Sequence, residues 1–145
     1  AQQFIDKYFK QFEKVQAYIE SVKQEARDTG LACTIYGRER DLSQGLESTV
    51  RSIREFSERA AFNTPLQGSA ADLMKLAMIR VMDKLTAENA ESQLILQVHD
   101  ELVLEAPKHE LTNVQAWVVE AMALGQPLRV PLEIDVNVGA TWMET

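Results

Sequence analysis

Three consecutive ionisable residues, His99, Asp100 and Glu101, stand between two apolar runs of this sequence. The runs, residues 94–98 and 101–105, flank a very short polar break, a pattern typical of a β-hairpin with His99 and Asp100 in its turn. Tight hairpin turns favour Asn-Gly or Asp-Gly, and this turn has no glycine. Carboxylates on a rigid tip can hold a hard divalent cation such as Mg²⁺, with His99 beside it and able to donate to a phosphate or sugar oxygen. The alternative interpretation is a solvated turn that is merely polar.

A second set of polar residues, Arg59, Asn63 and Gln67, recurs at steps of four. Such steps put side chains on one helix face, although a break at Pro65 would rotate Gln67. Their long or bidentate donors suit phosphates, sugars and the minor-groove acceptors that every base pair presents. A protein that must accept any sequence would read only such shared acceptors. The alternative is that Gln67 caps a helix and Arg59 pairs with Glu55.

The overall charge argues against nucleic-acid binding. The net charge is −7, whereas nucleic-acid-binding domains are usually basic. This objection weakens if the acidic residues bind metal or lie on faces away from DNA. A fainter basic set could meet a phosphate backbone, but the acidic residues between its members favour a mixed solvated face. The members of this set are Arg38, Arg40, Arg51 and Arg54.

The elements that must position these residues mix helices and strands without a regular βαβ rhythm, which predicts an α+β fold. Apolar spacings of three and four predict helices over 4–26, 47–62, 65–85 and 107–125. The helix from 65 should open with Thr64 as its cap and Gln67 in a capping box. Strands are expected over 31–36, 38–42, 94–98, 101–105 and 132–138, with a loop at 43–45. Because both faces of the 94–105 hairpin are mostly apolar, it should lie within a covered sheet.

Composition is that of an ordinary globular protein. The chain has 145 residues, of which 46% are hydrophobic and 26% charged, enough for one domain with a core. No apolar run approaches the roughly 20 residues that span a bilayer, so no membrane partner is expected. The single cysteine, Cys33, excludes an internal disulfide and suits a reducing cytoplasm, where we expect it to be a small buried hydrophobe.

Two stretches resemble the family A, DNA polymerase I-like, DNA polymerases. Residues 97–103, Gln-Val-His-Asp-Glu-Leu-Val, are similar to motif C of that family, and residues 58–72 are similar to the helix that follows the primer–template minor groove. The similarity covers nearly the whole chain, and the two motifs in this order are highly specific. The resemblance implies that residues 1–145 form a single unit, the C-terminal palm side of a polymerase domain. A hairpin and a further strand of the palm sheet would pack against several helices, with the thumb, most of the fingers and the first palm strands absent.

The resemblance also implies roles for the polar residues. Asp100 would be a catalytic metal ligand, Glu101 would support the metal site and His99 would contact the primer terminus. The helix residues Arg59, Asn63 and Gln67 would touch primer–template DNA. The reaction would be attack of a primer 3′-hydroxyl on a deoxynucleoside triphosphate (dNTP), assisted by two Mg²⁺ ions. The partners would be primer–template DNA, dNTP and the remaining polymerase domains.

The sequence departs from the family's pattern in several places, and two other functions remain as alternatives. The family's other catalytic aspartate has no counterpart, so the isolated chain is expected to be inactive. Glu39 and residues 43–45 replace further arginines and a Pro-Asp pair, and Glu13 replaces a common proline, so the first helix is expected to run unbroken. One rival is a non-catalytic DNA-binding or scaffold fragment. The other is a metal-dependent phosphohydrolase around His99 and Asp100, for which only His109 remains as a further histidine.

Overall fold

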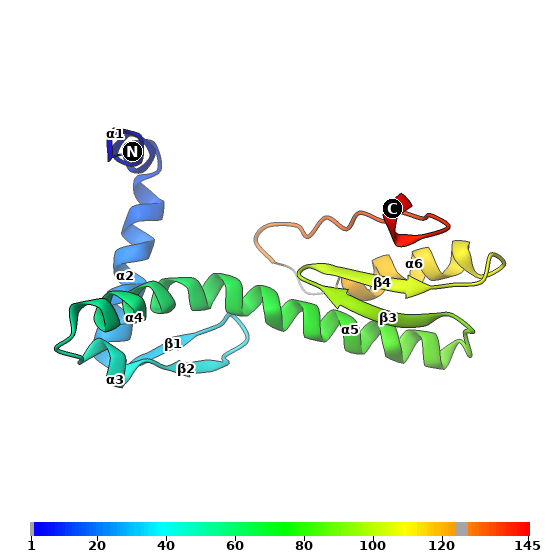
Figure 1. Cartoon of the computed structure of the whole chain (residues 1–145), viewed down its shortest axis with the longest axis horizontal. Coiled ribbons are helices and arrows are strands. Elements are labelled where there is room, and N and C mark those ends of the chain that lie inside the picture. Colours follow the sequence, from blue (N-terminus) through cyan, green and yellow to red (C-terminus); the bar gives the residue numbers. More distant parts are fainter. Residues whose placement is uncertain (1, 124–127) are drawn as a thin grey trace. The chain divides into compact units, whose positions relative to one another are not determined.

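The computed structural model describes residues 2–123 and 128–145 (Figure 1). The chain forms two compact units, an N-terminal unit that ends at Ser69 and a C-terminal unit that starts at Ala70, and each is described by itself. Helices and two small antiparallel sheets make up the described residues, so the predicted α+β class is confirmed. No helix in this part of the chain is both long and apolar enough to cross a membrane.

The N-terminal unit begins with two helices, α1 (Gln2–Gln11) and α2 (Glu13–Thr29), where the sequence predicted one. The prediction of an unbroken helix was wrong because Phe12 leaves the helical region, with φ −120° and ψ 58°. The Phe12 ring lies against the Tyr8 ring, with centroids 5.0 Å apart. The expected stop is confirmed: Gly30, at φ 75°, follows α2 and donates its N–H to the Ala26 carbonyl.

A short hairpin follows α2, as the sequence predicted. Strands β1 (Leu31–Cys33) and β2 (Glu39–Asp41) pair antiparallel, and Gly37 takes φ 80° in the turn between them. Glycine suits this position because residues with a Cβ rarely adopt positive φ. The prediction that Cys33 is buried was wrong, because its side chain projects from a two-stranded edge and is exposed.

The expected loop at 43–45 is a short helix, α3 (Ser43–Leu46). Asp41 starts it, because one carboxylate oxygen accepts hydrogen bonds from the Ser43 N–H (2.9 Å) and hydroxyl (2.6 Å). Helix α4 (Arg51–Asn63) then begins later than predicted. The core of this unit consists mainly of small side chains, which let helices α2 and α4 approach β1 closely. Its buried members are Ala26, Ala32, Leu42, Ala60 and Ala61.

No new capped helix starts at Pro65. Instead, Thr64–Gly68 forms a π-helical turn, η1, in which Thr64 keeps helical φ and ψ. The Thr64 hydroxyl donates to the Ala60 carbonyl (2.7 Å) rather than capping, and no side chain caps η1. A π turn shifts the backbone hydrogen bonds by one residue, which accommodates the missing N–H of Pro65. The predicted cap and capping box were therefore wrong.

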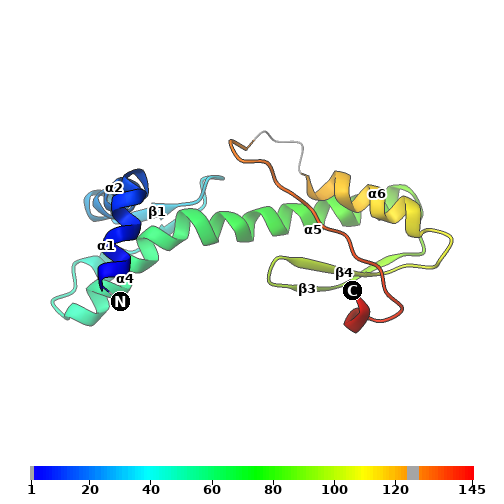
Figure 2. The ribbon, with the colours of Figure 1, turned by 90° about the horizontal axis from the view of Figure 1, so that it is seen from above.

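The C-terminal unit packs two helices against one face of a hairpin (Figures 1 and 2). Its elements are α5 (Ser69–Ala87), β3 (Gln93–Val98), β4 (Glu101–Glu105) and α6 (Leu111–Met122). Val81 and Leu85 of α5 meet Val114, Val118 and Ala121 of α6 in the core. Alternate residues of β4, Leu102 and Leu104, pack onto the same core, as the two-residue period of a strand requires.

The hairpin is confirmed, but its predicted place inside a covered sheet was wrong. Strands β3 and β4 form a two-stranded sheet of their own, and Ile95 and Leu96 are 55% and 43% exposed. Within residues 128–145, the expected strand 132–138 forms no ladder, and the only regular element is the 3-10 turn η2 (Trp142–Glu144). A strand needs a partner for its N–H and C=O groups, whatever its side-chain pattern. The predicted end of helix 107–125 lies outside the described residues, and α6 starts at Leu111.

Candidate functional site

The hairpin tip is the first of two places where predicted site residues gather. His99 and Asp100 form the turn, followed by Glu101 as the first residue of β4, and all three side chains are exposed. His99 adopts φ 52°, a left-handed conformation that is costly for a residue with a Cβ. The Gln97 side chain donates to the His99 carbonyl (2.6 Å) and so holds the turn. The sequence prediction of this turn is confirmed.

The tip offers two carboxylates on adjacent residues, Asp100 and Glu101. Among residues 2–123 and 128–145, no group of three or more His, Cys, Asp or Glu side chains is placed to hold a metal ion. Carboxylate oxygens are nevertheless the donors that Mg²⁺ prefers, and Mg²⁺ is commonly bound by one or two carboxylates together with substrate phosphates and water. The two carboxylates therefore suit a cation whose remaining ligands come from a phosphorylated substrate and water. They do not make a site built from protein ligands alone.

His109 does not add to this tip as a ligand group. Its Nε2 lies 4.0 Å from carboxylate oxygens of Glu91 and Glu110, in the turn before α6. A phosphohydrolase centre usually needs several His or Asp ligands. The described part of the chain gathers no such set, so the phosphohydrolase alternative gains no support.

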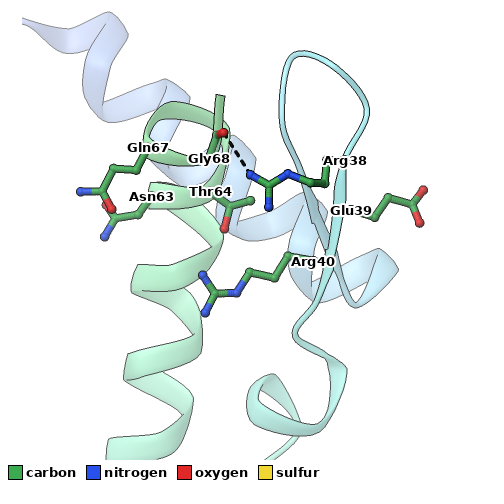
Figure 3. Close-up of a pocket in the computed structure, with 7 residues that line it drawn as sticks. All are labelled: Arg38, Glu39, Arg40, Asn63, Thr64, Gln67 and Gly68. Atoms are coloured by element: carbon green, nitrogen blue, oxygen red, sulfur yellow. Dashed lines mark hydrogen bonds between the residues drawn. The ribbon is translucent and has the colours of Figure 1, made fainter. Parts of the chain in front are cut away.

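The second place is a hollow of about 340 Å³ in the N-terminal unit (Figure 3). One wall comes from α4 and η1, and the other from the β1–β2 hairpin. Asn63 and Gln67 project from the same side of the helical wall, so the π turn does not separate them. The hollow is lined by Arg38, Glu39, Arg40, Asn63, Thr64, Gln67 and Gly68.

On the hairpin wall, the two arginines face the helical wall and the glutamate does not. The Arg38 guanidinium donates a hydrogen bond to the Gly68 carbonyl (3.1 Å), which ties the hairpin to η1. Side chains alternate along an extended chain, so Arg38 and Arg40 share a side that Glu39 does not. In Figure 3, both arginines reach toward the helical wall and the Glu39 carboxylate is directed away from it. The hollow therefore combines cationic donors with the amides of Asn63 and Gln67.

Arg59 is exposed on α4 but does not line this hollow. The alternative that it pairs with Glu55 was wrong, because Glu55 binds Arg51 instead (2.6 Å). The hydrogen bond and charge of Arg51 lower the pKa of Glu55, and Arg59 adds only a weaker, longer-range attraction. The alternative capping role of Gln67 was also wrong, since its side chain caps no helix here.

The faint basic set divides in two in the structure. Arg51 is engaged by Glu55, and Arg54 donates to the Ser48 carbonyl (3.1 Å), so both serve local structure. Arg38 and Arg40 join Asn63 in the hollow, which the sequence reasoning missed. The two-residue spacing of Arg38 and Arg40 in a predicted strand was the available signal, because it indicates one shared face.

Comparisons with known proteins agree on one family. Residues 1–144 match the model of DNA polymerase family A. DNA polymerase I, thermostable, from Thermus filiformis is 49% identical over 99% of this chain, and DNA polymerase I from Caldicellulosiruptor bescii is 46% identical over 100%. The chain spans 17% of the length of each relative. In structure, it is similar to the POL domain of Pol1 from M. smegmatis in complex with DNA primer-template and dNTP. That match has a TM-score of 0.84 and 43% identity, and covers 89% of this chain and 23% of the other.

Proposed function

Because this chain belongs to DNA polymerase family A, we propose that it is the palm-side part of a DNA-directed DNA polymerase. The reaction would join a deoxynucleotide from dNTP to the 3′-hydroxyl of a primer and release pyrophosphate. Since the chain spans only 17% of its relatives' length, the other domains would supply the remaining machinery. The observation that carries the proposal is the exposed His99-Asp100-Glu101 tip, held by a hairpin whose other side is packed on a helical core.

Family A DNA polymerases are metal-dependent enzymes, and we propose that the metal here is Mg²⁺. Asp100 would hold the ion, and Glu101, the next residue, would support the site. When bound, Mg²⁺ neutralises charge on the transferring phosphoryl group. The chain's own contribution is placement, because a two-residue turn between paired strands fixes the backbone position of Asp100.

The proposed DNA contacts divide between the two units. His99 would donate to a phosphate or sugar oxygen at the primer terminus. Arg59, Asn63 and Gln67 would touch primer–template DNA near its growing end, where amide groups can use the minor-groove acceptors common to all base pairs. The exposure of Arg59 and Gln67, and the position of Asn63 in an open hollow, support this role.

The test is the Asp100→Asn substitution in the full-length polymerase, measured by single-turnover primer extension and by affinity for primer–template DNA. Loss of several kcal/mol of metal-assisted stabilisation should slow extension by about 10²- to 10⁴-fold, with DNA affinity nearly unchanged. Asp83→Asn is the matched control, because Asp83 is an exposed aspartate on α5. Extension at the wild-type rate by the Asp100→Asn enzyme would refute the proposed role.

The second candidate function is a non-catalytic DNA-binding fragment, which the hollow beside Asn63 and Gln67 favours. Such a protein needs no carboxylate at the hairpin tip. In that case Asp100→Asn would leave every measurable function intact, whereas Asn63→Ala with Gln67→Ala would abolish it. The pair of substitutions therefore separates the two functions.

A further inference from the structure

We infer that the Ser69 hydroxyl positions Gln67 for its contact with primer–template DNA, by tying Pro65 to Ser69 across the π turn that carries Gln67. The inference rests on the proposed function, which supplies the contact between Gln67 and the DNA. It goes beyond that function by adding a residue that does not touch the DNA itself. Ser69 is only 5% exposed, so its side chain acts through Gln67 and is a positioning residue.

The first observation is an exchange of hydrogen-bond donors within the turn. An α-helix would pair the Pro65 carbonyl with the N–H of Ser69, four residues further on. In the π turn, that N–H donates to the Leu66 carbonyl. The hydroxyl of the same serine donates to the Pro65 carbonyl. The side chain therefore provides the Pro65 carbonyl with a donor and closes the segment 65–69, whose middle residue is Gln67.

The second observation is that the same hydroxyl reaches a distant part of the chain. It accepts a hydrogen bond of 2.9 Å from the N–H of Ile35, which lies 34 residues earlier in the loop between β1 and β2. A serine hydroxyl has one proton to donate and two lone pairs that accept, so both bonds form at the same time. The turn is therefore fixed to the hairpin as well as closed on itself. The backbone of Gln67 is thereby held relative to the opposite wall of the hollow.

The third observation concerns what remains when the Ser69 hydroxyl is removed. The Arg38 guanidinium still bonds to the Gly68 carbonyl, so the hairpin stays attached to the turn (Figure 3). Removal of the hydroxyl should therefore loosen the turn around its middle residue without detaching the hairpin. The chain also offers a comparison, because Ser57 is equally buried and its hydroxyl donates to the Ile53 carbonyl within its own helix (3.1 Å). Among the described residues, Ser57 bonds to no second element in this way.

The test measures the affinity of the full-length polymerase for primer–template DNA in a double-mutant cycle of Ser69→Ala and Gln67→Ala. Loss of one neutral hydrogen bond weakens binding by about two- to tenfold, and each single substitution should have an effect of that size. The double variant should bind no more weakly than Gln67→Ala alone, because Ser69 acts through Gln67. Ser57→Ala is the matched control, since it removes a hydroxyl from an equally buried serine, and its affinity should stay at the wild-type level.

The outcomes separate the inference from the proposed function. A residue with a merely structural role would lower the affinity by the same factor whether Gln67 is present or replaced. That result, an unchanged affinity of the Ser69→Ala variant, or an equal loss from Ser57→Ala refutes the positioning role and leaves the polymerase proposal standing. If Gln67→Ala binds DNA like the wild type, the Gln67 contact and the inference fail together, and the Asp100→Asn experiment still tests the reaction. Circular dichroism melting gives the folded fraction of each variant, so that affinities are compared for folded protein.

Discussion

The Arg38 guanidinium donates a hydrogen bond over 3.1 Å to the carbonyl oxygen of Gly68, thirty residues further along the chain. This contact joins the β1–β2 hairpin to the π-helical turn that carries Gln67. The approach is close enough to require glycine. A Cβ on Gly68 would lie 2.8 Å from the Thr34 Cγ2 and 3.5 Å from the Arg38 Nη2. The two walls of the hollow are therefore held together at a point that excludes any larger side chain.

Gly68→Ala should destabilise the N-terminal unit and separate these walls. An added methyl group in a tightly packed place usually costs about 1–3 kcal/mol, and here Thr34 is buried and has little room to move. The free energy of unfolding from urea titration measures the effect. Leu66→Ala is the control, because Leu66 is 55% exposed in the same turn and its loss should cost less than about 0.5 kcal/mol. Equal effects of the two substitutions would contradict the close-packing account.

The backbone of His99 predicts an unusual order of stabilities at the hairpin tip. At φ 52°, alanine carries the left-handed cost that glycine avoids, so His99→Gly should be more stable than His99→Ala by about 1 kcal/mol. His109 has no positive φ, so the order of stabilities should reverse there. The His109→Gly variant should be less stable than the His109→Ala variant by about 0.4–1 kcal/mol. Thermal unfolding of the four variants measures both differences. If the His99→Ala and His99→Gly variants unfold at the same temperature, the turn must relax to a conformation that alanine can adopt.

A long-range ion pair links α2 to α4, the helix that carries Arg59. Arg27 of α2 lies 2.9 Å from Glu58 of α4, and the Glu58 side chain is only 25% exposed. A double-mutant cycle with Arg27→Gln and Glu58→Gln should give a coupling energy of about 0.2–1 kcal/mol that shrinks as salt rises. The Arg51–Glu55 pair, on the exposed surface of α4, should couple by less than about 0.5 kcal/mol. No coupling between Arg27 and Glu58 would mean that the alanine-rich core alone holds the helices.

Local features of this fold could be predicted from the sequence, whereas features set by tertiary contact could not. The Gly30 helix stop and the His99-Asp100 turn depend on a few neighbouring residues, and both are confirmed. The break at Phe12 involves neither proline nor glycine, so apolar periodicity continued through it. Pro65 signalled a helix start, yet a π turn absorbs its missing N–H.

In the candidate site too, some groupings of residues could be predicted from local sequence, whereas others depend on tertiary contacts. Residues 99–101 are consecutive and Asn63 and Gln67 share a helical side, so their grouping follows from secondary structure alone. The addition of Arg38 and Arg40 to the hollow depends on how the hairpin packs against η1, which no local pattern encodes. Neither could the sequence show that Arg51, rather than Arg59, binds Glu55, because both lie one helical turn from it.

Acid should remove one contribution to the stability of the C-terminal unit. Glu110 accepts hydrogen bonds from the Ser92 hydroxyl and from the N–H groups of Ser92 and Glu91, and these bonds lower its pKa, the hydroxyl having the largest effect. A carboxyl whose pKa is lower in the folded state stabilises above its ordinary pKa of about 4.3 and loses that contribution as pH falls through the folded value. Glu110→Gln should therefore melt below the wild type at pH 7, with a gap that narrows toward pH 3. A gap that stays constant with pH would exclude the ionised form as the cause.

The segment 132–138 should exchange its amide hydrogens much faster than the hairpin. Its alternating side chains suit a strand, but within residues 128–145 it joins no ladder, and Leu132 and Val138 are exposed. Amides without backbone partners exchange at nearly the unfolded rate, whereas those paired between β3 and β4 require an opening event. Hydrogen–deuterium exchange of this 145-residue chain, followed by mass spectrometry, compares peptides from 132–138 with peptides from 93–105. Equal protection of the two segments would mean that 132–138 finds a strand partner in solution, and that its alternation is then used as the sequence predicted.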